Sequence, residues 1–203
     1  QAHAEAAARP GPLQLATAYA VFANHGLRIK SHYLLRVTDK DGKVLETFQP
    51  AAPDPVLDAR NAFVMTTMMQ DVVRRGTAAA ANRLGRSDIA GKTGTTNDHR
   101  DAWFAGYSPD RVAVAWLGYD QPKPLGPGET GGTSALPMWI HYMATALRAY
   151  PDKGFAMPGG ITVLNVDPKT GARVAEGGRP EYYYDEFAPV AAGGENRELV
   201  WGQ

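Results

Sequence analysis

The chain has 203 residues, and its 21 lysines and arginines are balanced by 21 aspartates and glutamates. This balance gives no support to binding of nucleic acid or another polyanion. The length and the 44% hydrophobic content predict one large or two small globular domains. The sequence contains no cysteine, and no apolar run approaches the roughly 20 residues of a membrane-spanning helix.

The first part of the chain predicts two helices separated by a β-hairpin. Pro12 suits the first position of a helix over residues 12–23, where apolar residues recur at helical spacing. Residues 34–48 predict two strands joined by a tight turn. Asp58 is a typical cap for a second amphipathic helix, over residues 59–75.

The middle of the chain predicts an antiparallel sheet. After a short helix over residues 78–84, three strands are expected at residues 89–96, 101–107 and 112–119. Their four-residue connections have turn compositions, so consecutive strands should pair as a meander. A helix over residues 134–150 should pack on one face of it. The fold class is therefore α+β, an antiparallel sheet with packed helices.

The two outer strands of this sheet have different character. Strand 89–96 is polar at its end, which suits an exposed edge. Strand 112–119 is apolar on both faces, which suits a position inside a sheet. We therefore expect its outer edge to be unpaired, covered by another segment or paired with another chain.

The last part of the chain predicts a separate region. A hairpin is expected over residues 159–175, around the turn Asp167–Gly171. The periodic signal weakens after Glu176. We expect residues 1–150 to form one domain portion and residues 151–203 to form a C-terminal extension with a β-hairpin.

The most informative stretch is Lys92-Thr93-Gly94-Thr95-Thr96, at the end of strand 89–96. Side chains alternate along a strand, so Lys92 and Gly94 share one face while Thr93 and Thr95 share the other. Gly94 has no Cβ and allows a ligand or a backbone to approach closely. An edge strand can accept a peptide as an added strand, and the threonine hydroxyls can bind a carboxylate.

Two other interpretations of this stretch are open. A polar edge strand can simply prevent aggregation. A phosphate loop also contains Gly-Lys-Thr, but Gly85 and Gly91 are separated by five residues, one more than that loop has. A phosphate loop leads into a helix, whereas a turn and another strand are expected here.

Five stretches closely resemble the class A, bifunctional penicillin-binding proteins. The similarity runs from about Pro12 to Tyr150 in the order expected of that family, and more loosely to Pro189. The residues before Pro10 do not resemble the family. The matching stretches are Gly11–Asn24, Met69–Ala78, Arg86–Tyr107, Trp116–Asp120 and Thr130–Gly132.

This resemblance implies a partial penicillin-binding/β-lactamase-like transpeptidase fold and a membrane-anchored parent protein. Such enzymes attack the terminal D-Ala-D-Ala of a peptidoglycan stem peptide with a serine, and pass the acyl group to an amine on another stem. β-Lactam antibiotics acylate the same serine. The implied location is the periplasmic or extracytoplasmic face of the bacterial inner membrane, and no cofactor or metal is implied.

The resemblance also implies roles for the residues of the central motif. Lys92 would hold a hydrogen-bond and charge network beside the catalytic serines. Thr93 and Thr95 would bind the carboxylate of the substrate or β-lactam, and the N–H of Thr95 would form half of the oxyanion hole. Gly94 and Thr96 complete the substrate-binding segment.

The nucleophile of the family is missing from this sequence. None of its four serines is followed by Lys three residues later or by Asn two residues later; they are Ser31, Ser87, Ser108 and Ser134. In the family these signatures lie in the upstream half of the same domain. We therefore expect this chain alone to be inactive. The alternative is a non-catalytic module that binds wall peptide or a partner protein.

Overall fold

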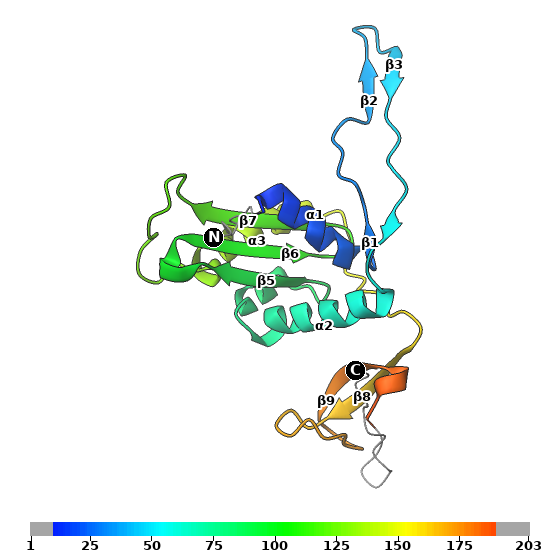
Figure 1. Cartoon of the computed structure of the whole chain (residues 1–203), viewed down its shortest axis with the longest axis vertical. Helices are drawn as coiled ribbons and strands as arrows, with labels where there is room; N and C mark the ends of the chain where they lie inside the picture. Colours follow the sequence, from blue (N-terminus) through cyan, green and yellow to red (C-terminus); the bar gives the residue numbers. More distant parts are fainter. Residues whose placement is uncertain (1–9, 190–203) are drawn as a thin grey trace, which may run out of the picture. The chain divides into compact units, whose positions relative to one another are not determined.

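The computed structural model describes residues 10–189. The chain divides into two compact units, Gln1–Ala156 and Met157–Gln203 (Figure 1). The predicted division into a domain portion and an extension at residue 150 stays a prediction. Within residues 10–189, no helix combines the length and the apolar character that a membrane crossing requires.

Helix α1, Pro12–Ala23, confirms the first predicted helix. The N–H of Gly11 donates to the side-chain oxygen of Gln14 at 2.6 Å, which closes the first turn. The helix is followed by Gly26 at φ +91°, where an added Cβ would lie only 2.1 Å from the carbonyl oxygen of Leu57. This close approach allows β1, Leu27–Arg28, to follow at once.

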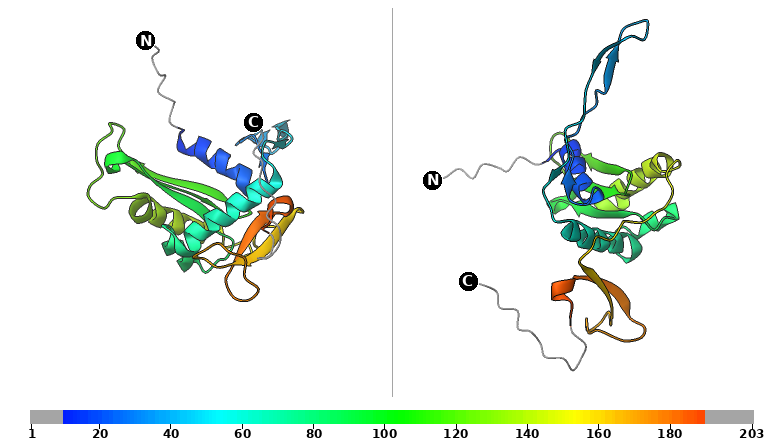
Figure 2. Two further views of the ribbon diagram at one scale, coloured as in Figure 1. Left: turned by 60° about the horizontal axis from the view of Figure 1, so that its bottom comes forward. Right: turned by 90° about the vertical axis from the view of Figure 1, so that its right-hand side faces the viewer.

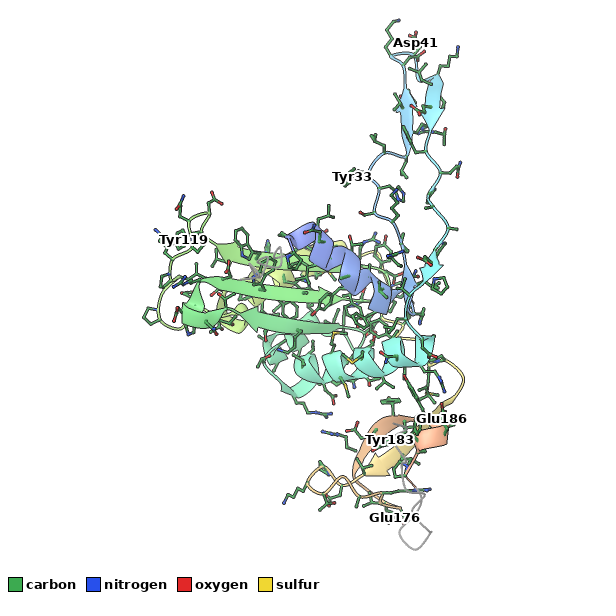
Figure 3. The ribbon with its side chains drawn as sticks, viewed as in Figure 1. Tyr33, Asp41, Tyr119, Glu176, Tyr183 and Glu186 are labelled. Carbon is green, nitrogen blue, oxygen red and sulfur yellow. The ribbon has the colours of Figure 1, made fainter. Side chains whose placement is uncertain are left out.

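Strands β2 (Arg36–Thr38) and β3 (Val44–Thr47) form the predicted hairpin. The Asp39 carboxylate accepts the N–H groups of Asp41 and Lys43 and fixes the turn. In the described part of the chain these strands pair only with each other, and both are exposed throughout. We call residues 29–53, which include this hairpin, the arm. Tyr33, labelled in Figure 3, belongs to the arm and is 79% exposed.

After the arm, strand β4 (Asp54–Pro55) pairs with β1, and the chain then enters helix α2, Ala59–Arg75. The Asp58 carboxylate accepts the N–H of Arg60 at 2.7 Å, which confirms the predicted cap. A 3₁₀-helix over Ala79–Leu84 takes the place of the predicted short helix and ends at Gly85, with φ +65°. The buried face of α2 comprises Ala62, Phe63, Thr66, Met69, Gln70 and Val73.

The central sheet has the predicted order. Strands β5 (Ala90–Thr95), β6 (Asp101–Tyr107) and β7 (Val112–Gly118) are consecutive antiparallel neighbours, so β5 and β7 are the outer strands (Figure 1). Among the described residues no strand pairs with the outer edge of β7, which is one of the three outcomes expected for it.

Helices cover both faces of this sheet, and Figures 1 and 2 show α3 across the sheet from α1. On one face the buried ring of Tyr107 contacts Tyr19 of α1 edge-on. On the other face Phe104 contacts Trp139 of α3, with 4.9 Å between ring centres. Side chains three residues apart on one strand point to opposite faces, which accounts for this division.

Helix α3 differs from the predicted helix over residues 134–150. It spans Leu136–Ala146 and is preceded by one π-helical turn, Gly131–Ala135, in which the N–H of Leu136 donates to the carbonyl of Gly131. After Ala146 the backbone bonds shorten to three-residue turns. Pro151 disfavours helical geometry only in Tyr150, so it limits these turns and does not account for the end of α3 at Ala146.

The second unit corrects one strand pairing. Strand β8 (Ile161–Val166) pairs with β9 (Arg179–Tyr184), whereas residues 159–175 supply only an isolated bridge from Val166 to Arg173. The predicted turn at Asp167–Gly171 is present, because the Asp167 carboxylate accepts two N–H groups. The chain reverses again at Gly177 and Gly178, both at positive φ, and it is this second reversal that brings β9 to β8.

A buried ion pair anchors the start of β5. Asp88 is completely buried, and its two carboxylate oxygens accept two N–H groups of Arg86 at 2.8 and 2.7 Å. The same guanidinium donates to the carbonyls of Tyr150 and Pro151. The ion pair therefore connects the start of the strand to the segment that follows α3. It is bidentate and almost completely shielded from solvent.

Replacement of Asp88 by asparagine should lower the free energy of unfolding by about 3 kcal/mol, because it leaves the Arg86 charge buried beside a neutral group. Urea unfolding measures this change. The matched control is Asp98→Asn, which breaks an exposed pair with Arg100 and should cost less than about 1 kcal/mol. Equal losses in the two variants would show that the buried pair has no special role.

Candidate functional site

The central motif, Lys92–Thr96, lies at the solvent-exposed, C-terminal end of the outer strand β5. Lys92 and Thr95 are exposed, whereas Ala90 and Gly91, at the start of β5, are buried. The strand leads into a short turn and then into β6, not into a long helix. This geometry contradicts the phosphate-loop interpretation, which requires a helix directly after Lys-Thr.

The backbone groups of β5 alternate between β6 and the free edge. The N–H of Thr96 donates to the carbonyl of Asp101 at 3.1 Å, and the register of the two strands continues from that pair. In an antiparallel ladder every second residue is bonded to the neighbouring strand. Gly94 therefore turns its N–H and C=O toward β6, whereas Thr93 and Thr95 turn theirs toward the free edge.

Lys92 brings a positive charge to the same edge. Its ammonium group donates to the carbonyl oxygen of Thr93 at 2.9 Å and lies 3.4 Å from the hydroxyl oxygen of Thr93. The free edge thus carries a cation, the N–H and C=O of Thr95, and the C=O of Thr93. These are the groups that bind an extended chain with an anionic end.

The hydroxyls of Thr93 and Thr95 lie on the other face from Gly94, as predicted. The hydroxyl oxygens of Thr93 and Thr77 are 2.7 Å apart. The hydroxyl of Thr95 accepts the N–H of Gly131 at 3.1 Å. Thr77 and Gly131 were not among the predicted site residues, although both lie in stretches that carry the family resemblance.

Glycines allow these segments to approach β5. A Cβ on Gly131 would lie 2.3 Å from the carbonyl oxygen of Trp103 and 2.6 Å from that of Gly94. A Cβ on Gly94 would lie 3.2 Å from the Cβ of Trp103. The turn before α3 therefore packs directly on the backbone of β5 and β6, and no larger residue fits at Gly131.

Thr96 lies apart from the other two threonines. Its hydroxyl accepts the N–H of Asp101 at 2.8 Å, so it stabilises the turn between β5 and β6. Its predicted part in substrate binding stays a prediction. Thr96 also lines a groove of about 550 Å³ on the α1 side of the sheet, together with Pro10, Gly11, Pro12, Leu15, Gly94, Asp101, Trp103 and Trp116.

Three of the four serines have partners away from the motif. The Ser87 hydroxyl donates to Asp152, Ser108 accepts N–H groups of its own turn, and Ser134 donates to Glu129. No hydrogen bond joins Lys92 to any serine within residues 10–189. Among the described residues, Ser87, Ser108 and Ser134 are therefore engaged in contacts of their own, away from Lys92.

Comparison with known proteins identifies relatives over most of the chain. A family model described as the penicillin binding protein transpeptidase domain matches residues 11–139. Penicillin-binding protein 1A of Neisseria lactamica is 49% identical over 159 residues, which cover 76% of this chain and 20% of that protein. The protein of the same name from Pseudomonas aeruginosa is 38% identical over 225 residues, covering 87% and 27%.

Solved structures agree with this assignment. Penicillin-binding protein 1A from Haemophilus influenzae has a TM-score of 0.84 at 30% identity, covering 89% of this chain and 33% of that one. The penicillin-binding protein PonA1 from Mycobacterium tuberculosis has a TM-score of 0.60 at 29% identity, covering 71% and 40%. The chain spans only 20% to 27% of the length of these two curated relatives. The family model alone covers more than half of the chain, and the chain therefore belongs to the penicillin-binding protein transpeptidase family, as its resemblance to the class A members predicted.

Proposed function

We propose that the chain is the C-terminal portion of a D,D-transpeptidase domain in a longer, membrane-anchored penicillin-binding protein. Residues 1–150 would form the domain portion, and residues 151–203 would form the extension. The observation that carries this proposal is the position of Lys92–Thr96 on an outer strand, with the free backbone groups of Thr93 and Thr95 on its open edge.

In this proposal a peptidoglycan stem peptide adds beside β5 as an extra strand. The hydroxyls of Thr93 and Thr95 bind the terminal carboxylate of the peptide, and the Lys92 ammonium adds favourable charge. The N–H of Thr95 points toward the free edge, where it can donate to the oxyanion of the reacting carbonyl. The second oxyanion donor would be the N–H of the serine supplied by the upstream half of the domain.

The reaction has two steps that share one intermediate. The upstream serine hydroxyl attacks the carbonyl of the penultimate D-alanine, its proton passes to the departing amine, and the terminal D-alanine leaves. An amine of a second stem peptide then attacks the acyl-serine, forms the new peptide bond and returns the proton to the serine. A β-lactam reacts in the first step by opening its ring amide, and it remains attached.

The partners follow from this chemistry. They are peptidoglycan stem peptides, β-lactam antibiotics and the upstream half of the domain, at the outer face of the bacterial inner membrane. No cofactor and no nucleic acid takes part in the proposal. The alternative is a non-catalytic module that binds wall peptide or a partner protein. A Ser-x-x-Lys upstream in the longer protein would exclude that alternative.

The isolated chain should not be labelled covalently by a fluorescent penicillin, because it lacks the nucleophile. The longer protein should be labelled at one serine. Gel fluorescence after incubation and denaturation measures both. Stable, stoichiometric labelling of residues 1–203 would contradict the proposal.

In the longer protein, Lys92→Ala and Thr95→Val should both slow acylation by a penicillin. Thr95→Val keeps the backbone donor but loses the proposed carboxylate contact and the hydrogen bond from the N–H of Gly131, so a loss of about tenfold is expected. That loss should be smaller than the roughly hundred- to thousandfold cost of removing an oxyanion donor. Stopped-flow acylation measures the rates, and Thr47→Val, on the exposed strand β3, is the control. Rates near the parent value for both site variants would remove these residues from the site.

A further inference from the structure

The two carboxylate-binding hydroxyls of the proposed site each have a second contact that affects where their protons point. Thr95 accepts the N–H of Gly131, and Thr93 lies 2.7 Å from the hydroxyl of Thr77. Neither Thr77 nor Gly131 belongs to the Lys-Thr-Gly strand. Both contacts come from the ends of helical segments that pack against β5.

The hydrogen bonds of Thr95 show that its hydroxyl proton is available to a ligand. A threonine hydroxyl has one proton to donate and two lone pairs that accept. The backbone N–H of Gly131 can only donate, so Thr95 accepts from it and keeps its own proton for another partner. Gly131 is the first residue of a helix that continues through α3 to Ala146, and amides at a helix start carry partial positive charge. This polarises the Thr95 hydroxyl as a donor.

Whether the hydroxyl proton of Thr93 is available to a ligand depends on the direction of its hydrogen bond with Thr77. The Lys92 ammonium, 3.4 Å from the Thr93 hydroxyl oxygen, can only donate to it. If Thr77 donates as well, both lone pairs of Thr93 are used and its proton is left for a ligand. If Thr93 donates to Thr77 instead, its proton is no longer available to an anion. Donation from Thr93 to an anionic ligand therefore requires that Thr77 be the donor of the hydrogen bond between the two threonines.

Glycines lie next to Thr77 on both of the segments that meet there. Gly76 ends α2, and a Cβ there would lie 2.9 Å from the Cα of Val72. A Cβ on Gly132 would lie 3.1 Å from the carbonyl oxygen of Thr77. Gly132, in the turn before α3, therefore packs closely on the carbonyl of Thr77, which brings this turn next to the residue that contacts Thr93.

We infer that Thr77 and Gly131 are positioning residues that hold the hydroxyls of Thr93 and Thr95 as donors, so that the site prefers an acyl donor with an anionic carboxylate over the same compound with a neutral ester. This inference rests on the proposed transpeptidase function. It assigns to the proposed substrate site two residues outside the motif and a chemical basis for selectivity.

The test replaces Thr77 in the longer protein with valine, which keeps the shape and removes the hydroxyl. Gly131 cannot carry the test, because any side chain there collides with backbone. The measured quantity is the second-order acylation rate constant for a penicillin, divided by that for its carboxylate methyl ester. Loss of one hydrogen bond should lower this ratio about three- to tenfold in Thr77→Val. Thr77→Ser keeps the hydroxyl and should restore the parent ratio.

Two results would overturn the inference. An unchanged ratio with both rates lowered would show that Thr77 only supports the fold, and an unchanged ratio with unchanged rates would show that its hydroxyl has no role. The Lys92→Ala and Thr95→Val variants are measured in parallel. If they slow acylation while Thr77→Val leaves the ratio unchanged, only this inference fails. If they also have no effect, the proposed function fails as well.

Discussion

The antiparallel pairing of β5 with β6 is the constraint on which the rest of the site depends. It uses the backbone groups of Lys92 and Gly94 and turns those of Thr93 and Thr95 outward. The buried pair of Arg86 with Asp88 holds the strand where it enters the sheet. A slip of one residue in this pairing would exchange the two sets of backbone groups and move every side chain to the opposite face.

Much of this architecture could be predicted because it is encoded locally. Short turns require consecutive strands to pair, so the order of β5, β6 and β7 followed from turn composition alone. The partner of β8 could not be predicted in this way. A good local turn at Asp167–Gly171 suggested one partner, but the glycines at 177 and 178 reverse the chain again and bring in β9. The π-helical turn before α3 packs closely on β5 through Gly131, a contact that local sequence does not show.

The site likewise has features that local sequence predicts and features that depend on distant contacts. Strand alternation placed Lys92 and Gly94 on one face and Thr93 and Thr95 on the other, and the structure has this arrangement. The contact from Thr77 was not predictable, because it joins residues 16 positions apart through the end of a helix. What could have indicated it is the pair of glycine-containing stretches, at 76 and at 131–132, since glycine inside a structured segment often marks a close approach.

The outward-facing backbone of β5 has a consequence for molecular discrimination. N–H and C=O groups are the same in every residue of a peptide, so an edge that pairs through them measures chain direction and extension and is insensitive to the side chains that pass. In the proposed function, the distinctive group of the ligand would be recognised only by the hydroxyls of Thr93 and Thr95. A site of this kind would tolerate variation along the body of its ligand and would concentrate its selectivity at one end, which is also the end that a small, rigid mimic would need to copy.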